Sequence, residues 1–312
     1  MTITDYQNYT KNRYFLALIS LIILFLLRMI LKWFKLQLLL LLLGFPSLIF
    51  SQKTNISCKE IVAKSLQSIK EIKGLKYHLK ITERGKKGYN YYESAVKFNR
   101  NPRLIYLYIK GIELLWLQGK NAGKALVKPN FFPYFNLNLD PMGNLMRQDQ
   151  HHTLNEMGYD YFAGIIKHTI DKIGDKFDDY FEYAGEERVN NRLCYKININ
   201  NKDFGYTNYT IGQNESITSI ARKFYIAEYM ILEKNSKFND YFDILKVGQV
   251  IKIPTWYCKT VTIYIDQFYF VPISLKTSDD KGLFEEYNYY FLQVNPKFEE
   301  GEFTRNFKDY KF

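Results

Sequence analysis

Strand-like segments fill most of the chain after residue 75, and this pattern constrains the fold more than any other feature. Apolar and polar residues alternate in Tyr77–Ile81, and similar short runs follow, broken at Gly85–Gly88, Gly111 and Gly119–Gly123. Aromatic residues make up 17% of the 312 residues, which favours half-buried pleated surfaces over a helical bundle. Successive short strands with such breaks predict an antiparallel meander.

Helices and a second group of strands complete the pattern. A capping box at Ser57 and Glu60 predicts a helix that runs to Gly74, and another helix is expected from Leu154 to Ile173. The later strands are expected at Phe181–Tyr183, Leu193–Ile199, Thr260–Ile265, Phe268–Lys276 and Leu283–Val294. Strands and helices that pack together in this order predict an α+β fold.

Between about residues 206 and 256 the strand pattern gives way to a compact βααβ segment. Ser216 is placed to cap a helix, and short strands are predicted at Tyr209–Ile211 and Val250–Pro254. The residues that carry the pattern are Tyr209, Ile211, Ser216, Ile217, Ile220–Phe224, Ile226, Ile231, Asn235, Leu245, Gly248–Val250, Ile253 and Pro254. This segment closely resembles a LysM module.

The LysM resemblance implies a small domain, residues 207–256, that binds N-acetylglucosamine-containing glycans such as peptidoglycan. The family binds glycan, largely through backbone groups, between the loop before its first helix and the loop after its second. LysM modules usually have Gly-Asp-Thr where this chain has Asn214-Glu215-Ser216. A degenerate module kept as a spacer or for protein contact is the alternative. The groove residues that the resemblance implies are Asn214, Glu215, Ser216, Ile217, Asn235, Ser236 and Lys237.

A second set of motifs surrounds this module. It comprises Lys97–Tyr106, Gly111–Trp116, Gly119–Ala125, Leu139–Pro141, Met146–Thr153, Asp279–Glu285, Asn295–Pro296 and Glu302–Phe303. This set resembles the DUF1571 proteins of Bacteroidota, a family with no established activity. Its architecture looks like that of LolA-type periplasmic carriers. The resemblance implies an unclosed antiparallel half-barrel packed on helices, built here from residues 52–205 and 257–312, with an apolar cavity for a lipid or lipoprotein acyl chain.

Aromatic residues on the strands are the candidates for the lining of such a cavity. Ligand sites are mostly apolar with few polar groups, and ordinary core packing is the alternative reading of the same residues. Alternation along a strand places the last three candidates on one face. The full set is Tyr106, Tyr108, Trp116, Phe270, Tyr287, Tyr289 and Phe291.

The motif Gln150-His151-His152-Thr153, followed by Glu156, is the most chemically distinctive run in the chain. Imidazole and carboxylate ligands suit zinc, iron or manganese. Adjacent His side chains point in different directions, however, and Glu156 is the third helical residue of a capping box that begins at Thr153. We therefore expect a structural helix entry, with no metal and no cofactor. A metal-dependent hydrolase that uses Asp149, His151 and His152 is the less favoured alternative.

The sequence contains no nucleophile elbow, phosphate-binding glycine loop or His-Glu-x-x-His motif. Its carboxylate pairs are consecutive residues on hydrophilic stretches, which is typical of solvated surfaces. We therefore predict a binding protein without catalytic activity. An envelope scaffolding protein with no ligand is a further alternative.

The N-terminus predicts export. Two apolar runs, Phe15–Leu27 and Leu36–Phe50, are each shorter than the ~20 residues that a spanning helix needs. Read from Met29, a basic stretch, a Leu-rich core and a polar exit at Ser51-Gln52 have the layout of a signal peptide. We expect cleavage between those two residues, which removes residues 1–51 and leaves a periplasmic or envelope protein. A retained anchor in the inner membrane is the alternative.

The net charge of +11 does not indicate a nucleic-acid-binding protein. Residues 1–51 hold five Lys or Arg and one Asp, so their removal lowers the net charge to +7. The remaining basic residues are scattered, and export separates the chain from nucleic acid. The expected partners are peptidoglycan and a lipid or lipoprotein, and we expect a monomer.

Three cysteines are too few for a disulfide scaffold. Cys194 and Cys258 lie on the two strands that flank the inserted module. If those strands pair, the Cα atoms could fall within the usual distance of about 4.4–6.8 Å, and an oxidising periplasm would favour the bond. A bond between Cys58 and Cys194 is the alternative.

Overall fold

The computed structural model describes residues 27–33 and 56–312, except for residues 149, 239 and 244. The chain divides into two units, Met1–Asn55 and Ile56–Phe312. In the first unit, residues 27–33 are helical, and the predicted cleavage site lies outside the described residues. Within the described ranges, no helix combines the length and the apolar character needed to cross a lipid bilayer.

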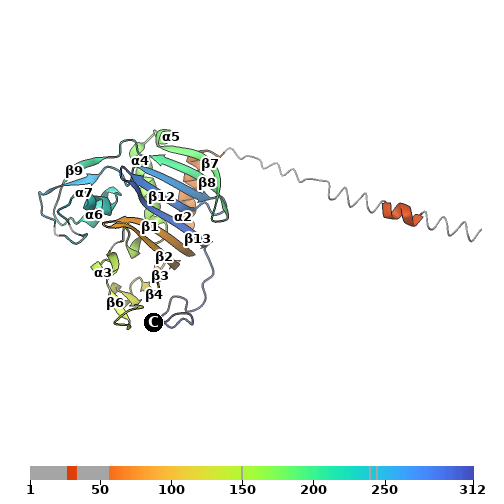
Figure 1. Ribbon diagram of the computed structural model, residues 1–312, viewed down its shortest axis with the longest axis horizontal. Coiled ribbons are helices and arrows are strands. Elements are labelled where there is room, and N and C mark those ends of the chain that lie inside the picture. Colours follow the sequence, from red (N-terminus) through yellow and green to blue (C-terminus); the bar gives the residue numbers. More distant parts are fainter. Residues whose placement is uncertain (1–26, 34–55, 149, 239, 244) are drawn as a thin grey trace, which may run out of the picture. The chain divides into compact units, whose positions relative to one another are not determined.

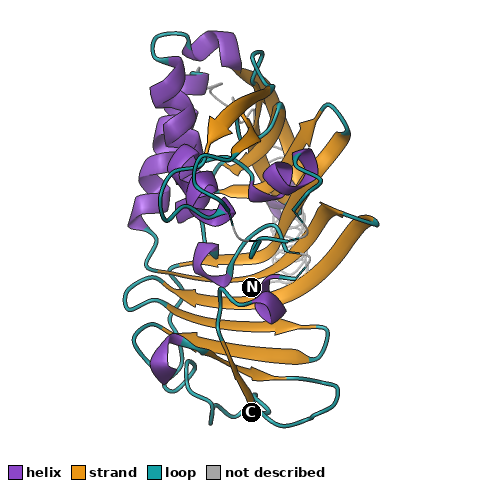
Figure 2. Ribbon diagram, turned by 90° about the vertical axis from the view of Figure 1, so that its left-hand side faces the viewer, coloured by secondary structure: helices purple, strands orange, loops and turns teal. Residues whose placement is uncertain are grey.

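The second unit is built on one antiparallel sheet of eleven strands (Figures 1 and 2). The strands are β1 Gly74–Gly85, β2 Gly88–Asn99, β3 Leu104–Ile109, β4 Ile112–Leu117, β5 Ala125–Lys128, β6 Leu137–Leu139, β7 Phe181–Val189, β8 Arg192–Asn200, β11 Thr260–Asp266, β12 Pro272–Asp279 and β13 Gly282–Val294. Their order is β6-β5-β4-β3-β2-β1-β13-β12-β11-β8-β7. The strands β6 and β7 form the two edges, so the sheet is unclosed, as the sequence predicts.

The helices lie beside this sheet (Figure 2). They are α2 Cys58–Glu71, α3 Asn144–Arg147, α4 Asp160–Ile173 and α5 Phe177–Tyr180, with short 3-10 turns η1 Asn121–Gly123 and η2 Leu154–Glu156. The predicted capping box starts α2, because the Ser57 side chain accepts a hydrogen bond from the backbone N–H of Glu60.

The predicted helix from 154 to 173 is interrupted between η2 and α4. Gly158 has φ +92°, a backbone conformation that side chains disfavour. A Cβ atom there would lie 3.2 Å from the ring of Phe98, so the chain passes very close to the sheet at this point. This close approach breaks the helix, although Gly174 ends it as expected.

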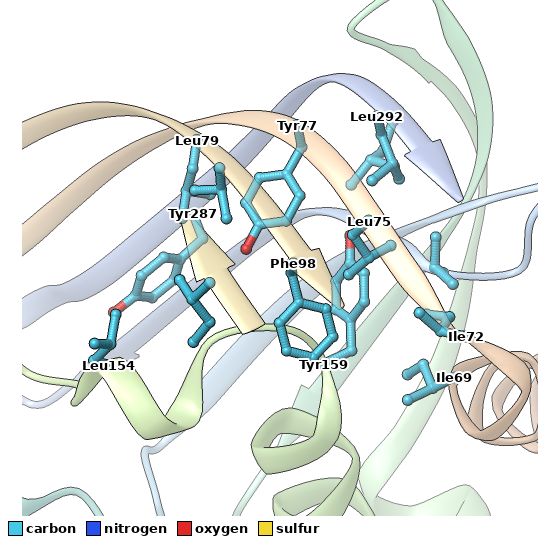
Figure 3. Packing of buried hydrophobic residues seen from close by; sticks show 14 of the residues in the cluster. Ile69, Ile72, Leu75, Tyr77, Leu79, Phe98, Leu154, Tyr159, Tyr287 and Leu292 are labelled. Carbon is cyan, nitrogen blue, oxygen red and sulfur yellow. The ribbon is translucent and has the colours of Figure 1, made fainter. Parts of the chain in front are cut away.

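Two of the apolar clusters in the unit pack against the eleven-stranded sheet. Figure 3 shows Leu75 and Tyr77 of β1 and Phe98 of β2 pointing towards Tyr159. The second cluster packs α2 and α4 against β8 and β11, and includes Ile61, Val62, Ile166, Ile173, Ile197, Ile199, Ile263 and Ile265. Both helices are thereby fixed to the sheet through their apolar faces.

The strand that the sequence predicts from Phe268 begins only at Pro272. The Asp266 carboxylate accepts hydrogen bonds from the backbone N–H groups of Phe268 and Tyr269, at 3.1 and 2.6 Å. The N–H of Phe270 also donates to the Asp266 carbonyl at 2.9 Å. These bonds satisfy the backbone in a tight turn between β11 and β12, so the aromatic run 268–270 is a turn.

The predicted disulfide between Cys194 and Cys258 is wrong. β8 and β11 do pair, but the register sets Cys194 opposite Asp266, whereas Cys258 precedes β11. The eight residue steps from 258 to 266 span about 26 Å of extended chain, which no disulfide can bridge. All three cysteines, including Cys58, carry free thiols.

The interruption in the sheet has the predicted βααβ order. It consists of β9 Tyr206–Thr210, α6 Ile217–Phe224, α7 Glu228–Lys234 and β10 Val250–Pro254. β9 and β10 form a separate two-stranded antiparallel sheet. Ser216 caps α6 by accepting from the N–H of Ser219 at 3.1 Å. The segment has its own apolar cluster, which includes Ile211, Ile217, Ile220, Ile226, Ile231, Ile251 and Ile253.

Candidate functional site

A cavity of about 550 Å³ lies between the sheet and the segment that contains α3, η2 and α4. Alternation along the strands aims every second side chain of β1 and β3 into it. Its apolar lining includes Tyr77, Leu79, Ile81, Leu107, Ile109, Ile112, Leu114, Val127, Leu137, Leu139, Leu145, Met146, Leu154, Phe162, Ile165 and Leu275. The volume falls within the range of about 300–1,000 Å³ that is typical of small-molecule sites.

Two of the aromatic candidates, Tyr287 and Tyr289 of β13, line this cavity as the sequence predicts. Tyr106 and Tyr108 do not, because their neighbour Leu107 takes the cavity side of β3 and alternation turns them to the other face. There Tyr106 stacks on Tyr310 with ring centroids 3.8 Å apart, and Tyr108 is exposed to solvent.

The other three aromatic candidates do not line the cavity either. Trp116 is buried in the core, where its indole N–H donates to the Gly123 carbonyl at 3.0 Å. Phe270 belongs to the turn after β11 and packs against the second apolar cluster, which joins α2 and α4 to β8 and β11. Phe291 is 79% exposed. A register shift between β1 and β13 places it in a bulge with φ +52°, which turns its ring away, and Leu292 fills the core position.

A cluster of polar side chains borders one part of the cavity. Glu83, His152, Glu156, Tyr257 and Glu285 all contribute to the lining. Glu285 is 1% exposed and Glu83 is 2% exposed, whereas the His152 side chain is 26% exposed, so the two glutamates are the part of the cluster that is removed from water. Charged side chains that are buried to this degree must be paired and hydrogen-bonded.

His151 is held as a cation by its acceptors. Its Nε2 lies 2.8 Å from the backbone carbonyl oxygen of Arg84, which can only accept, so Nε2 carries a proton. Its Nδ1 lies 3.0 Å from Glu285 Oε2, where a carboxylate also accepts. The ring is stacked between Tyr229 and Phe284. Burial opposes the charge, but the hydrogen bond to Glu285 and the nearby carboxylates outweigh it and raise the pKa of His151.

His152 is also a cation, but it faces different partners. Its Nδ1 lies 3.3 Å from Glu156 Oε2, and its Nε2 lies 3.1 Å from the hydroxyl of Tyr257. That hydroxyl donates its proton to Glu285 Oε1 at 2.7 Å, so it accepts from the imidazole. Burial disfavours the charge, yet the hydrogen bonds with Glu156 and Glu285 raise the pKa of His152 to about 10.

The three carboxylates of the cluster are matched by three cations. Glu156 pairs with Arg222 of α6 as well as with His152. Glu83 accepts hydrogen bonds from the Tyr287 hydroxyl at 2.5 Å and from the backbone N–H of His151 at 3.2 Å. Burial alone would raise the pKa of Glu285, but its bonds to the two histidines lower it overall. The formal charges of the three carboxylates and the three cations therefore cancel.

The structure groups the metal-binding candidates differently from the sequence prediction. Potential ligand atoms of Glu83, His151 and Glu285 lie within 4.8 Å of one another, whereas His152 faces Glu156 and Asp149 lies outside the described residues. A metal at the first three would have to displace the Nδ1 proton of His151, which already balances Glu285. The arrangement favours the structural role that the sequence predicts for this motif.

The rest of the motif supports that role. The Thr153 N–H donates to Glu156 Oε2 at 2.9 Å and completes the predicted capping box at η2. Gln150 borders the cavity, and its carbonyl accepts from the Tyr241 hydroxyl at 3.1 Å. The motif thus joins the cavity wall to the βααβ segment.

Buried ion pairs join the βααβ segment to α3 and to the eleven-stranded sheet, and no sequence pattern indicates them. Arg147 of α3 pairs with Glu228 of α7, and these side chains are 1% and 0% exposed. Arg84 of β1 pairs with Glu233 of α7 at 2.9 Å and with Asp279 of β12 at 2.5 Å. The partners are 81, 149 and 195 residues apart, far beyond any local spacing rule.

The predicted glycan-binding residues fall into two groups. Asn214, Ser216, Ser236 and Lys237 are exposed at the ends of the two helices. Glu215, Ile217 and Asn235 hold the segment together: Glu215 accepts from Gly212 and Tyr209, Ile217 is fully buried, and the Asn235 amide bonds to Ile231 and Lys252. Of the predicted glycan-binding residues, only the first group has side chains open to solvent.

Comparison with solved structures finds several similar chains. The MucA/MucB complex of Pseudomonas aeruginosa aligns at 9% identity with a TM-score of 0.38, over 79% of this chain and 60% of that chain. Lipoprotein LppX of Mycobacterium tuberculosis aligns at 12% identity and 0.36, over 78% and 99%. A LolA superfamily protein of Nitrosomonas europaea aligns at 10% identity and 0.27, over 80% and 98%. A search of curated protein sequences gives no match.

One protein family is matched directly by sequence. Residues 209–254 match the family model of the LysM domain, which confirms that resemblance. The DUF1571 resemblance stays a prediction, as do the domain boundaries at residues 207 and 256. The chain is an α+β protein with an unclosed antiparallel sheet and helices, and its residues 209–254 are a LysM domain.

Proposed function

We propose that this protein is a non-catalytic component of the cell envelope that holds the acyl chain of a lipid or lipoprotein in its cavity. The cavity itself carries the proposal, because it is large, buried under α4 and walled mainly by aliphatic and aromatic side chains. Each buried methylene contributes about 0.8 kcal/mol, so ten would contribute about 8 kcal/mol before the costs of association. An acyl chain is the ligand class that uses such walls fully.

Titration with a fluorescent fatty acid tests this part of the proposal. Leu107→Trp adds bulk inside the cavity and is expected to weaken binding about tenfold or more. Tyr108→Trp is the matched control, since it changes the next residue of β3 on the opposite, exposed face. Equal binding by both variants, or no binding by the unaltered protein, would contradict the proposal and favour a scaffolding role.

We further propose that the LysM domain binds peptidoglycan. The exposed residues Asn214, Ser216, Ser236 and Lys237 support this, since they lie in the loop before α6 and the loop after α7, the two loops that the LysM resemblance implies in glycan binding. Because Arg147–Glu228 and Arg84–Glu233 join the domain to the rest of the unit, one folded unit would carry both ligands.

A pull-down on purified peptidoglycan tests the LysM part. Deleting the domain would leave buried Arg147 without Glu228 and would remove one of the two carboxylates that pair with Arg84, so a point change is the sharper experiment. Ser236→Trp should block the groove and abolish retention, whereas Lys246→Trp, at another exposed site of the domain, should not. Retention of the Ser236 variant would exclude this groove, and no retention of the unaltered protein would leave the domain a spacer.

A further inference from the structure

The loop between β5 and β6, residues 129–136, exposes a dense group of aromatic rings. The exposed fractions are 57% for Phe131, 81% for Phe132, 62% for Tyr134 and 62% for Phe135. Isolated exposed apolar residues are common, but four exposed aromatic residues within five positions form a patch of the kind that marks an interaction site.

This loop lies at the opening of the cavity. Phe131 lines the cavity and is also more than half exposed, and the same is true of Leu145 on α3, which is 75% exposed. Side chains that belong both to a cavity wall and to the surface mark the place where the cavity meets solvent. An acyl chain that enters the cavity there passes along the aromatic loop.

Specific hydrogen bonds fix the loop in this form. The Asn130 amide donates to the Lys110 carbonyl at 2.5 Å, Lys128 donates to the Tyr134 carbonyl, and the Tyr134 N–H donates to the Phe131 carbonyl at 2.9 Å. A Cβ atom at Gly111 would lie 2.8 Å from the Asn130 amide, so the β3–β4 turn and the loop fit closely. The rings are thus held outward by the backbone.

The charge around the loop favours an anionic surface. No Asp or Glu occurs between Glu113 and Asp140. Two lysines adjoin the loop, since the Lys110 carbonyl accepts from Asn130 and the Lys128 ammonium donates to the Tyr134 carbonyl. Glu113 itself is 3% exposed and accepts hydrogen bonds from the backbone N–H of Lys311, so it adds little charge to the surface. Aromatic rings flanked by lysine are the combination that binds the interface of a bilayer with anionic lipids.

We propose that residues 129–136 dock the protein on an anionic lipid bilayer, and that an acyl chain moves between the bilayer and the cavity past Phe131 and Leu145. Entry of the chain rests on the proposed lipid-binding function, whereas docking is a separate property of the loop. The rings would lie at the depth of the lipid headgroups, and the lysine side chains would reach the phosphates.

Co-sedimentation with phosphatidylglycerol–phosphatidylcholine vesicles tests the docking. The chain that begins at Gln52 is suitable, because the unit Ile56–Phe312 has its own core. We expect the double variant Phe132→Ser/Phe135→Ser to lower the vesicle partition coefficient about tenfold or more. The matched control is Phe268→Ser/Phe291→Ser, which removes two rings that are each 79% exposed elsewhere and should change nothing.

Fluorescent fatty acid binding without vesicles separates the two proposals. The loop variant should bind the free fatty acid as the unaltered protein does, which also shows that it is folded. Vesicle binding that is unchanged in the loop variant, or lost equally in the control variant, would overturn the docking proposal. Sedimentation that shows dimers dependent on Phe132 and Phe135 would also overturn it. Loss of fatty acid binding by the unaltered protein, with loop-dependent vesicle binding intact, would refute only the cavity function and the entry route.

Discussion

At the scale of single residues, the two adjacent histidines show how acceptors determine charge. His151 meets a backbone carbonyl and Glu285, while His152 meets Glu156 and a hydroxyl whose proton is already donated. Each ring therefore keeps both protons. The sequence predicts a polar helix entry here, because the capping-box spacing is local. It does not predict Glu285 as the shared partner, since that residue follows 134 positions after His151.

This arrangement predicts a specific dependence of stability on pH. Folding raises the pKa of His152 from about 6.5 to about 10, so its stabilisation is complete below pH ~6.5 and is lost as the pH rises towards 10. His152→Gln should lower the free energy of unfolding by about 3 kcal/mol at pH 7, and by clearly less at pH 10. Urea unfolding at several pH values measures this.

His168→Gln is the control for that series. Among the described residues, no carboxylate forms a hydrogen bond with His168, and partial burial together with Lys172 lowers the pKa of His168, so it is neutral above pH 7. Its replacement should leave the slope between pH 7 and 10 unchanged. A penalty for His152→Gln that stays constant across this range would show that His152 is not charged in the folded protein.

At the scale of helices and strands, local patterns are predicted well and pairings are not. The capping box at Ser57, the break between strands at Gly85–Gly88 and the cap at Ser216 depend on neighbours within a few residues, and all are confirmed. The break at Gly158 depends on the ring of Phe98. The outward turn of Phe291 depends on a bulge between β1 and β13. Such long-range fits leave no periodic signal in the sequence.

The buried ion pair between α3 and α7 yields an element-scale prediction. Arg147→Met leaves Glu228 buried with only a longer contact to Arg222, at 3.6 Å, and should destabilise the protein by about 3 kcal/mol. Arg147→Met/Glu228→Leu should recover much of this loss, because no unpaired charge remains. Urea unfolding of both variants gives the two values.

A surface pair supplies the comparison. Lys167 and Asp171 of α4 pair at 2.5 Å but are 69% and 60% exposed, so Lys167→Met should cost no more than about 0.5 kcal/mol. If Arg147→Met costs as little as Lys167→Met, the contact between the LysM domain and the sheet unit is not held by this pair.

At the scale of the whole unit, the cavity and the LysM domain are parts of one structure. The polar cluster joins them, since Glu156 contacts His152 at the cavity wall and Arg222 on α6. The sequence predicts a half-barrel with an apolar cavity and correctly assigns Tyr287 and Tyr289 to it. It assigns Tyr106 and Tyr108 to the wrong face, because the direction in which a strand faces is set by its neighbours in the sheet.

The most direct test of the central claim is native mass spectrometry of the protein isolated from the cells that produce it. The cavity predicts a bound lipid whose mass adds to that of the chain and is recovered by solvent extraction. Tyr108→Trp should retain this ligand, and Leu107→Trp should lose most of it, because Leu107 lines the cavity and Tyr108 does not. An unaltered protein that carries no lipid, or a Leu107→Trp variant with the same occupancy, would contradict the claim that this cavity holds an acyl chain.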